Sequence, residues 1–376
     1  MTTPIAPPAT IGMLGGGQLG RYALMAARTM GYRTIVLEPD PHAPAGSIAD
    51  LHLVADYDDA EALRRLGDES EVVTTEFENP PAAALDALRR RTSVAPAPEA
   101  VAVAQDRIAE KRFLVDAGLP VAPFAVVDDA DADPSVGYPA ILKTARLGYD
   151  GKGQRLVADA SEMRAAWRTL GSVPCVLERA LQLQTELSVV VARSATGGFA
   201  AYPVAENTHV DGILDLSIVP ARVGRRLSDR AVGLAMTIAD ALAYVGVLAV
   251  EFFVVDGDVV VNELAPRPHN SGHWTLDVAQ TNQFEQQIRA ICGLALGDTS
   301  MTRPAAAMVN LLGDLWDAGE PDWASALDGG QTALHLYGKR AARPGRKMGH
   351  VTAWGALPEE AEVRALQARQ ALTRRG

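Results

Sequence analysis

The sequence predicts an α/β protein with a doubly wound parallel sheet at its N-terminus and antiparallel sheet structure in the rest of the chain. Up to about residue 96, short apolar runs alternate with helical patterns, which is typical of a parallel sheet. The segment APAPEA at residues 95–100 marks a boundary, because paired prolines break both helices and strands. From residue 185 onward, apolar runs alternate in the manner of antiparallel strands.

The elements of the first part follow one another at short intervals. Apolar runs predict strands at residues 11–14, 34–37, 51–54, 71–76 and 92–95. Helical patterns between these runs predict helices at 18–30, 58–66 and 81–90.

The middle of the chain has a different order of elements. We expect helical structure over 99–117, strands near 123–127 and 138–143, a glycine-rich loop, a helix over 161–170 and a strand ending at Glu178. The antiparallel part then contains apolar runs at 186–194, 199–205, 246–255 and 258–264.

Composition limits the classes of function. The chain has 376 residues, 48% of them hydrophobic, so it can bury a large core in two or three domains. Its net charge of −11 argues against nucleic-acid or anionic-membrane partners, and an anionic ligand would need a local cationic pocket. Cys175 and Cys292 offer no disulfide framework, and the start MTTPIAPPAT does not look like a secretion signal. We therefore expect a cytoplasmic protein.

Lysine is rare in this chain, where arginine is common. Only five of the 35 basic residues are lysines, so a lysine suggests a need for a compact ammonium group. Lys143, Lys152 and Lys339 lie in motifs with a chemical interpretation, whereas chance explains Lys111 and Lys347 equally well.

The segment MLGGGQLG carries the spacing G-x-G-x-x-G at Gly15, Gly17 and Gly20. This spacing suggests a dehydrogenase, because such glycines let a backbone approach a pyrophosphate at a helix N-terminus. Glu38 even ends the next apolar run, where an acid that binds ribose would stand. A second-domain site for hydride transfer is not evident, however.

The segment LKTARLGYDGKG places Lys143 at a strand end, ahead of Gly148, Gly151 and Gly153. A glycine-rich loop exposes consecutive N–H groups to phosphate oxygens, and the lysine adds a point charge. The pattern indicates a nucleoside triphosphate site outside the P-loop class. A flexible hairpin with solvated charges is the alternative.

The segment VEFFVVDGDVVVNEL predicts a β-hairpin that carries Glu251 and Glu263. A two-residue loop would place Glu251 opposite Asn262, and a three-residue loop would place it opposite Glu263. We favour the three-residue loop, because the strands are otherwise apolar and two facing carboxylates form a Mg²⁺ site. An edge hairpin with solvated acids is the alternative.

The next segment, APRPHNSGH, concentrates polar chemistry in a few positions. Arg267, His269, Asn270 and Ser271 supply anion binding, proton transfer and hydrogen bonding, on a backbone stiffened by two prolines. These four residues are our candidates for catalysis.

Taken together, these motifs resemble the ATP-grasp carboxylate–amine ligases, and within them the N5-carboxyaminoimidazole ribonucleotide synthases of purine biosynthesis. The resemblance extends from GGGQLG and TTEFEN through KTARLGYDGKGQ, ENTHVDGILDLS and NELAPRPHNSGHWT to YGKRAARPGRKMGH. It implies an ATP-grasp architecture in four parts: a Rossmann-like domain (1–105), linker helices and a lid (106–184), an antiparallel core with the metal site (185–300) and a C-terminal subdomain (301–376).

The resemblance also assigns roles to residues. Those implied for ATP are Arg107, Lys143, the loop Gly148, Tyr149, Asp150, Gly151, Lys152, Gly153 and Gln154, the hinge Glu178, Arg179, Ala180 and Leu181, and Glu186, His209, Asn262 and Glu263. Glu251 and Glu263 match the magnesium ligands. Gln18, Leu19, Glu76, Lys339 and Arg346 match positions for the ribonucleotide, although a basic solvated loop would also explain the last two. Asp150 matches a position near the aminoimidazole, which adds it to the catalytic candidates.

The implied reaction carboxylates 5-aminoimidazole ribonucleotide with ATP, Mg²⁺ and bicarbonate, without biotin or nicotinamide. Bicarbonate attacks the γ-phosphorus, carboxyphosphate breaks down to CO₂, and the amine captures CO₂ while His269 or the released phosphate accepts its proton. Two other functions stay open: formate-dependent phosphoribosylglycinamide formyltransferase and a noncatalytic nucleotide sensor. The family also suggests a homodimer.

Overall fold

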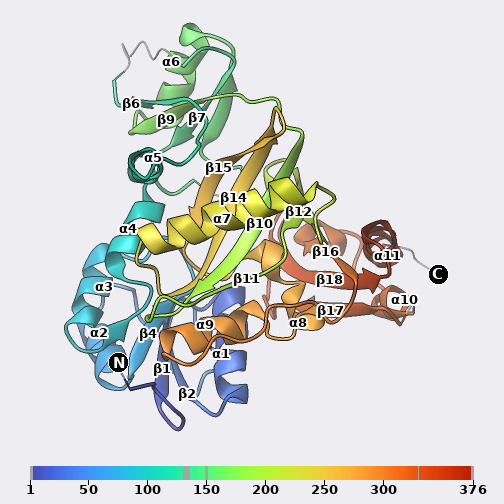
Figure 1. Ribbon diagram of the computed structural model, residues 1–376. Helices are drawn as coiled ribbons and strands as arrows, with labels where there is room; N and C mark the ends of the chain where they lie inside the picture. The colour runs from blue at the N-terminus through green and yellow to red at the C-terminus, as the bar shows by residue number, and fades with distance from the viewer. Residues whose placement is uncertain (1–2, 130–135, 149–150, 329, 374–376) are drawn as a thin grey trace.

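The fold consists of three β-sheets, with the small sheet at the top of Figure 1, the N-terminal sheet at the lower left and the large sheet between them. A computed structural model describes residues 3–129, 136–148, 151–328 and 330–373. Across these ranges, no helix combines the length and the apolar character that a membrane span needs.

The N-terminal sheet is parallel, with strand order β3-β2-β1-β4-β5. Its strands are β1 (Thr10–Leu14), β2 (Arg33–Leu37), β3 (Leu51–Leu53), β4 (Val72–Thr75) and β5 (Ser93–Val94). Three helices connect them, α1 (Gln18–Thr29), α2 (Ala60–Asp68) and α3 (Ala82–Arg89). Strands buried on both faces explain the near-continuous apolar runs of this part. The predicted doubly wound sheet is confirmed.

Two helices lead from this sheet to the next one. The stretch over 99–117 is helical as predicted and is divided into α4 (Pro98–Gln105) and α5 (Arg107–Asp116). Asp106 has an extended backbone, and its carboxylate accepts hydrogen bonds from the N–H groups of Ile108 and Ala109. This N-cap begins a new helix at Arg107 and thereby aims α5 at the centre of the molecule.

The small sheet at the top of Figure 1 has the order β6-β9-β7-β8 and packs against α6 (Ala160–Thr169). Its strands are β6 (Phe124–Val127), β7 (Ala140–Thr144), β8 (Gln154–Val157) and β9 (Cys175–Arg179), and every pair of neighbours is antiparallel. The glycine-rich loop connects β7 to β8.

The largest sheet is antiparallel, with the order β15-β14-β10-β12-β13-β16-β18-β17, and β11 pairs with β10. Its strands are β10 (Thr185–Arg193), β11 (Phe199–Ala201), β12 (Ala205–Val210), β13 (Ile213–Val219), β14 (Gly246–Val255), β15 (Asp258–Ala265), β16 (Ala305–Leu312), β17 (Thr332–Leu336) and β18 (Lys347–Gly355). Because β13 pairs with β16, one sheet continues across residue 301.

Helices cover this sheet from several sides (Figure 1). They are α7 (Arg225–Ala241), α8 (Thr275–Val278), α9 (Gln283–Ile291), α10 (Trp323–Leu327) and α11 (Pro358–Ala371), with short 3₁₀ turns at Asn270–Gly272 and Gly313–Trp316. Leu234 and Ile238 of α7 pack against Leu248 and Phe252 of β14 in the largest apolar cluster. Helix α9 lies between α1 and the large sheet, so it joins the N-terminal domain to the core.

Candidate active site

One cleft of about 870 Å³ lies where the three sheets meet. Strands β7, β14 and β15, the start of α1, the glycine-rich loop and the loop before β18 all contribute to its lining. The predicted site residues that line it are Gln18, Leu19, Arg107, Lys143, Gly148, Gly151, Lys152, Gln154, Glu186, His209, Glu251, Asn262, Glu263, Arg267, His269, Asn270, Lys339 and Arg346.

A smaller set of predicted residues is not found among the lining residues in the part of the chain that the structure covers. These are Glu76, Gly153, Glu178, Arg179, Ala180, Leu181 and Ser271. Glu178 and Ser271 contact residues that do line the cleft, at Lys143 and His269 respectively. Tyr149 and Asp150 lie outside the described residues.

In the hairpin of β14 and β15, Glu251 lies opposite Glu263 as predicted, but a β-bulge and not the length of the loop is the cause. The loop has two residues, Asp256 and Gly257, both with positive φ, and Val255 pairs with Asp258. The predicted three-residue loop is therefore wrong. A β-bulge at Asn262 shifts the register by one residue, so that Glu251 pairs with Glu263.

The two carboxylates have unequal environments. Burial and the charge of Glu263 raise the pKa of Glu251 to about 7. Burial also opposes ionisation of Glu263, but Arg107 together with Lys143 and Lys111 outweighs burial and holds the pKa of Glu263 below its usual value. The guanidinium of Arg107 donates a hydrogen bond of 2.8 Å to Glu263. Glu263 therefore carries a negative charge, and a bound cation would stabilise a second negative charge on Glu251.

These oxygen atoms fit a magnesium ion. Mg²⁺ prefers carboxylate and amide oxygens together with substrate phosphates. In the lining of the same cleft, the side-chain oxygen of Asn262, the neighbour of Glu263 in the chain, is buried and has no hydrogen-bond partner among the residues described. Such an unpartnered oxygen beside two facing carboxylates is a donor set for a hard cation.

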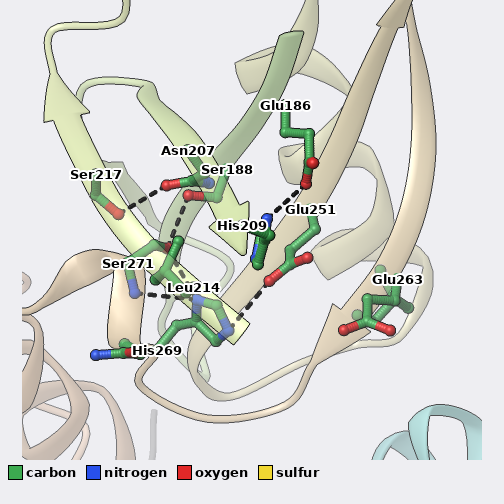
Figure 2. A network of polar contacts seen from close by, with 12 residues as sticks. Glu186, Ser188, Asn207, His209, Leu214, Ser217, Glu251, Glu263, His269 and Ser271 are labelled. Atoms are coloured by element: carbon green, nitrogen blue, oxygen red, sulfur yellow. Dashed lines mark hydrogen bonds and ion pairs between the residues drawn. The ribbon is translucent and has the colours of Figure 1, made fainter. Parts of the chain in front are cut away.

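His269 is held in a chain of hydrogen bonds that Figure 2 shows from Ser188 to Glu251. Ser188 donates to Ser271, whose Oγ lies 2.8 Å from Nδ1 of His269. The backbone N–H of Ser271 also donates to Nδ1, so the proton of the neutral ring is on Nε2, 3.3 Å from Glu251. Burial and the charge of Arg267 hold the pKa of His269 well below its usual value, so the ring is neutral.

Arg267 and Asn270 both have protein partners. Arg267 forms an ion pair with Glu78, and burial lowers the pKa of its guanidinium to about 10. Asn270 exchanges two side-chain hydrogen bonds with Asn310, at 3.0 and 2.7 Å. The cluster predicted from APRPHNSGH is thus assembled, but each side chain is also tied to the scaffold.

Lys143 lies on β7 beside the hinge strand β9. Its ammonium donates to Glu178 at 3.2 Å, and Lys111 approaches the same carboxylate oxygen at 3.4 Å. On the other side of the cleft, Glu186 of β10 and His209 of β12 form an ion pair of 2.7 Å (Figure 2). Burial lowers the pKa of His209, but Glu186 and Glu251 together outweigh burial and raise the pKa above its usual value.

The motif GGGQLG binds the protein's own carboxylates. Glu76 accepts hydrogen bonds from the N–H groups of Gly17 and Gly20, and Glu38 accepts one from Gly16. A Cβ atom on Gly17 would lie 2.5 Å from Glu76, which explains the glycine at this position. The amides that hold a pyrophosphate in a dehydrogenase are therefore occupied.

Comparison with known proteins agrees with this geometry. Residues 8–105 match the ribonucleotide synthetase preATP-grasp domain, residues 112–284 match the ATP-grasp domain, and residues 306–364 match the phosphoribosylaminoimidazole carboxylase C-terminal domain. The N5-carboxyaminoimidazole ribonucleotide synthase of Bacillus subtilis is 44% identical over 353 residues, which cover 93% of this chain and 92% of the relative. The Brucella melitensis synthase is 45% identical, with 93% and 97% covered.

The chain belongs to the N5-carboxyaminoimidazole ribonucleotide synthase family. A crystal structure of an ADP complex of an N5-carboxyaminoimidazole ribonucleotide synthetase superposes with a TM-score of 0.90 at 41% identity, covering 98% of both chains. A structure of the Aspergillus clavatus synthase in complex with ADP and 5-aminoimidazole ribonucleotide gives a TM-score of 0.86 at 29% identity, with 97% of this chain and 98% of that chain covered.

The cleft also contains charged residues that were not predicted from the sequence. Glu78 pairs with Arg267, and Arg343 and Lys347 join Lys339 and Arg346 in one basic wall. The rarity of lysine was the available signal, because four of the five lysines line the cleft and Lys111 lies behind it. Lys347 lines the cleft and Lys111 contacts Glu178, although the sequence left both open to chance.

Proposed function

We propose that this chain is an ATP-dependent carbon–nitrogen ligase that carboxylates 5-aminoimidazole ribonucleotide with bicarbonate, in purine biosynthesis. The observation that carries the proposal is a single cleft in which a carboxylate pair, the strand lysine Lys143 and a basic wall face one another. The synthases that resemble this chain along more than nine-tenths of its length support the same reaction.

We assign ATP to the side of the cleft formed by β7, β9 and β15. Lys143 and the glycine-rich loop would bind the phosphates, the hinge at 178–181 would contact adenine, and Glu186 would contact the ribose. Glu251 and Glu263, with Asn262 next to Glu263, would hold Mg²⁺, which when bound neutralises charge shared by the β- and γ-phosphate oxygens.

The ribonucleotide would bind at the opposite end, near the start of α1. Lys339 and Arg346 would hold its phosphate, and Gln18 and Leu19 would contact the remainder. In an acidic protein, this basic wall supplies the local cationic pocket that a phosphate needs.

The chemical steps follow from this arrangement. A bicarbonate oxygen attacks the γ-phosphorus, the bond to the bridging oxygen breaks, and ADP leaves. Carboxyphosphate divides into CO₂ and phosphate within the cleft, which shields it from bulk water. The amine then attacks CO₂ and loses one proton. Since both ring nitrogens of His269 are engaged, we assign that proton to the departing phosphate.

The proposal also includes a domain division, an oligomeric state and a cellular location. In the domain division, residues 1–105 contact the ribonucleotide and residues 106–184 include the lid. Residues 185–300 hold the metal ion, and residues 301–376 bind the phosphate of the ribonucleotide. The working form is a homodimer, which light scattering on the purified chain would test. The place of action is the cytoplasm, in keeping with two buried free cysteines at 175 and 292.

An assay of ADP release tests the reaction directly. We expect bicarbonate-dependent ADP release that 5-aminoimidazole ribonucleotide stimulates, with the carboxylated product identified by mass spectrometry. Stimulation by formate and phosphoribosylglycinamide instead would indicate the related formyltransferase. Stoichiometric ATP binding without turnover would indicate a sensor.

The carboxylate pair gives a sharper prediction. Glu251→Gln or Glu263→Gln should raise the Mg²⁺ concentration needed for half-maximal rate and lower ADP release by about 10²-fold or more, as loss of a transition-state charge partner does. Asp258→Asn, at the exposed end of the same hairpin, is the matched control and should leave both values unchanged. A double replacement with normal turnover would contradict the metal assignment.

A further inference from the structure

Helix α5 contacts three consecutive residues of β15 through one of its faces. Arg107 donates to the carboxylate of Glu263 at 2.8 Å. Glu110 accepts a 2.5 Å hydrogen bond from the backbone N–H of Leu264, and Lys111 donates a 2.9 Å bond to the backbone carbonyl of Asn262. Positions 107, 110 and 111 have the i, i+3, i+4 spacing that places side chains on the same side of a helix.

Two of these contacts are made to the backbone at the free edge of the large sheet. Strand β15 is the terminal strand, so the groups on its outer side have no further strand to pair with. Just beyond α5, the carbonyl of Pro120 accepts a 2.8 Å hydrogen bond from the N–H of Val261. The stretch from Val261 to Leu264 is therefore bound on its outer side by α5 and the segment that follows.

This stretch contains the β-bulge that decides where the carboxylates lie. Phe252 pairs with Val261, so a regular ladder would place Glu251 opposite Asn262 and turn Glu263 to the other face. The bulge at Asn262 places Glu263 opposite Glu251 instead. The contacts that α5 and Pro120 make with Val261–Leu264 therefore hold the β-bulge, and the pairing of Glu251 with Glu263 depends on this bulge.

We propose that Glu110 and Lys111 are positioning residues that fix this bulge and thereby set the distance between Glu251 and Glu263. The inference rests on the proposed function, because it concerns the magnesium site assigned above. Neither residue needs to touch nucleotide or ribonucleotide for this role.

Burial supports the assignment. The exposed fraction of Lys111 is 0% and that of Glu110 is 2%. Taking an ammonium and a carboxylate out of water is unfavourable, and apolar side chains would fill the same space at lower cost. Lys111 also lies 3.4 Å from Glu178, but its contact with the carbonyl of Asn262 is shorter, at 2.9 Å. Buried charges that contact the backbone of the bulge are explained by the conformation they select.

The test uses Mn²⁺ as a probe, since its binding to the ADP-bound enzyme can be followed by electron paramagnetic resonance without turnover. Lys111→Met and Glu110→Met remove a donor and an acceptor while keeping similar volume. We expect each to weaken Mn²⁺ binding about tenfold or more and to speed hydrogen exchange in the peptide that contains Val261–Leu264. Glu110→Gln keeps an acceptor oxygen and should restore Mn²⁺ binding.

Phe113→Leu is the matched control, because Phe113 lies on the same helix and packs against the apolar core. It should lower the thermal midpoint while Mn²⁺ binding stays at the wild-type value. Folded Lys111→Met and Glu110→Met proteins that bind Mn²⁺ as the wild type does would overturn the proposal.

The wild-type protein gives an independent check in case the variants fail to fold. The amide of Leu264 should exchange slowly, although its strand is at a sheet edge, and rapid exchange would overturn the proposal. These readouts need neither bicarbonate nor 5-aminoimidazole ribonucleotide. A wild type that binds Mn²⁺ and ADP but carboxylates nothing would therefore refute the proposed reaction and leave the positioning role standing.

Discussion

At Glu178, a single carboxylate lies between two buried lysines, Lys143 and Lys111. Burial opposes its ionisation, but the two ammonium groups outweigh burial and hold its pKa below the ordinary value of 4.5. A carboxylate with a lowered pKa stabilises the folded state above that ordinary value, and the stabilisation is lost as the pH falls through the lowered pKa.

Glu178→Gln should therefore lower the free energy of unfolding by about 3 kcal/mol at neutral pH, because it leaves buried ammonium groups without a counter-charge. The difference from wild type should shrink as the pH falls below 4.5. Denaturant unfolding at a series of pH values measures it. Glu61→Gln, in an exposed pair with Arg64, is the control and should show no such difference. A difference independent of pH would contradict the argument.

Among the elements, α1 and its glycine-rich start show how a local pattern can have two structural explanations. The G-x-G-x-x-G spacing needs glycine because Gly15 has a φ of +101° and Gly17 is approached closely by Glu76. A pyrophosphate or a carboxylate imposes the same demand on the backbone. The sequence contained Glu76, but its distance of 56 residues from Gly20 hid the contact.

A titration of NADH fluorescence tests this explanation. We expect no saturable binding, since Glu38 and Glu76 occupy the amides that a pyrophosphate would use. A fluorescent ADP analogue in the same experiment is the positive control, for which we expect saturable binding at the proposed ATP site. Saturable NADH binding would reopen the dehydrogenase hypothesis.

Helix α7 is the element that sequence reading should have found. It has 17 residues, and its buried positions Ala231, Leu234, Ala235 and Ile238 follow helical spacing. These residues belong to the largest apolar cluster, so the periodicity from Ala231 to Ala239 was a sufficient local signal for a helix.

On the scale of the whole molecule, the cleft exists only because three sheets and the helices between them are packed together. ADP and the ribonucleotide would each contact more than one sheet, so their binding should raise the thermal midpoint of the entire fold. A ligand at a hundred times its dissociation constant adds about 2.7 kcal/mol to the free energy of unfolding.

Variants of the basic wall should separate the two ligands. Lys339→Met and Arg346→Met should remove most of the thermal shift caused by 5-aminoimidazole ribonucleotide and keep the shift caused by ADP with Mg²⁺. Arg340→Met, at an exposed position of the same loop, is the control and should keep both. Equal loss of both shifts would mean that the loop supports the fold and has no particular role toward the phosphate.

The sequence by itself determined the parallel N-terminal sheet, the antiparallel remainder and many of the charged and polar residues that line the cleft. The sheets follow from local periodicity, and the lining residues follow partly from motifs that suit phosphate, metal and proton chemistry and partly from the resemblance to the family. The tertiary structure alone decided which partners these residues have. Asp106 divides a helix, Asn262 shifts a strand, and Glu76, Glu78 and Glu178 bind groups far away in the chain. Such contacts depend on how elements dock, and docking is governed by packing and burial across the whole fold, which no local pattern records.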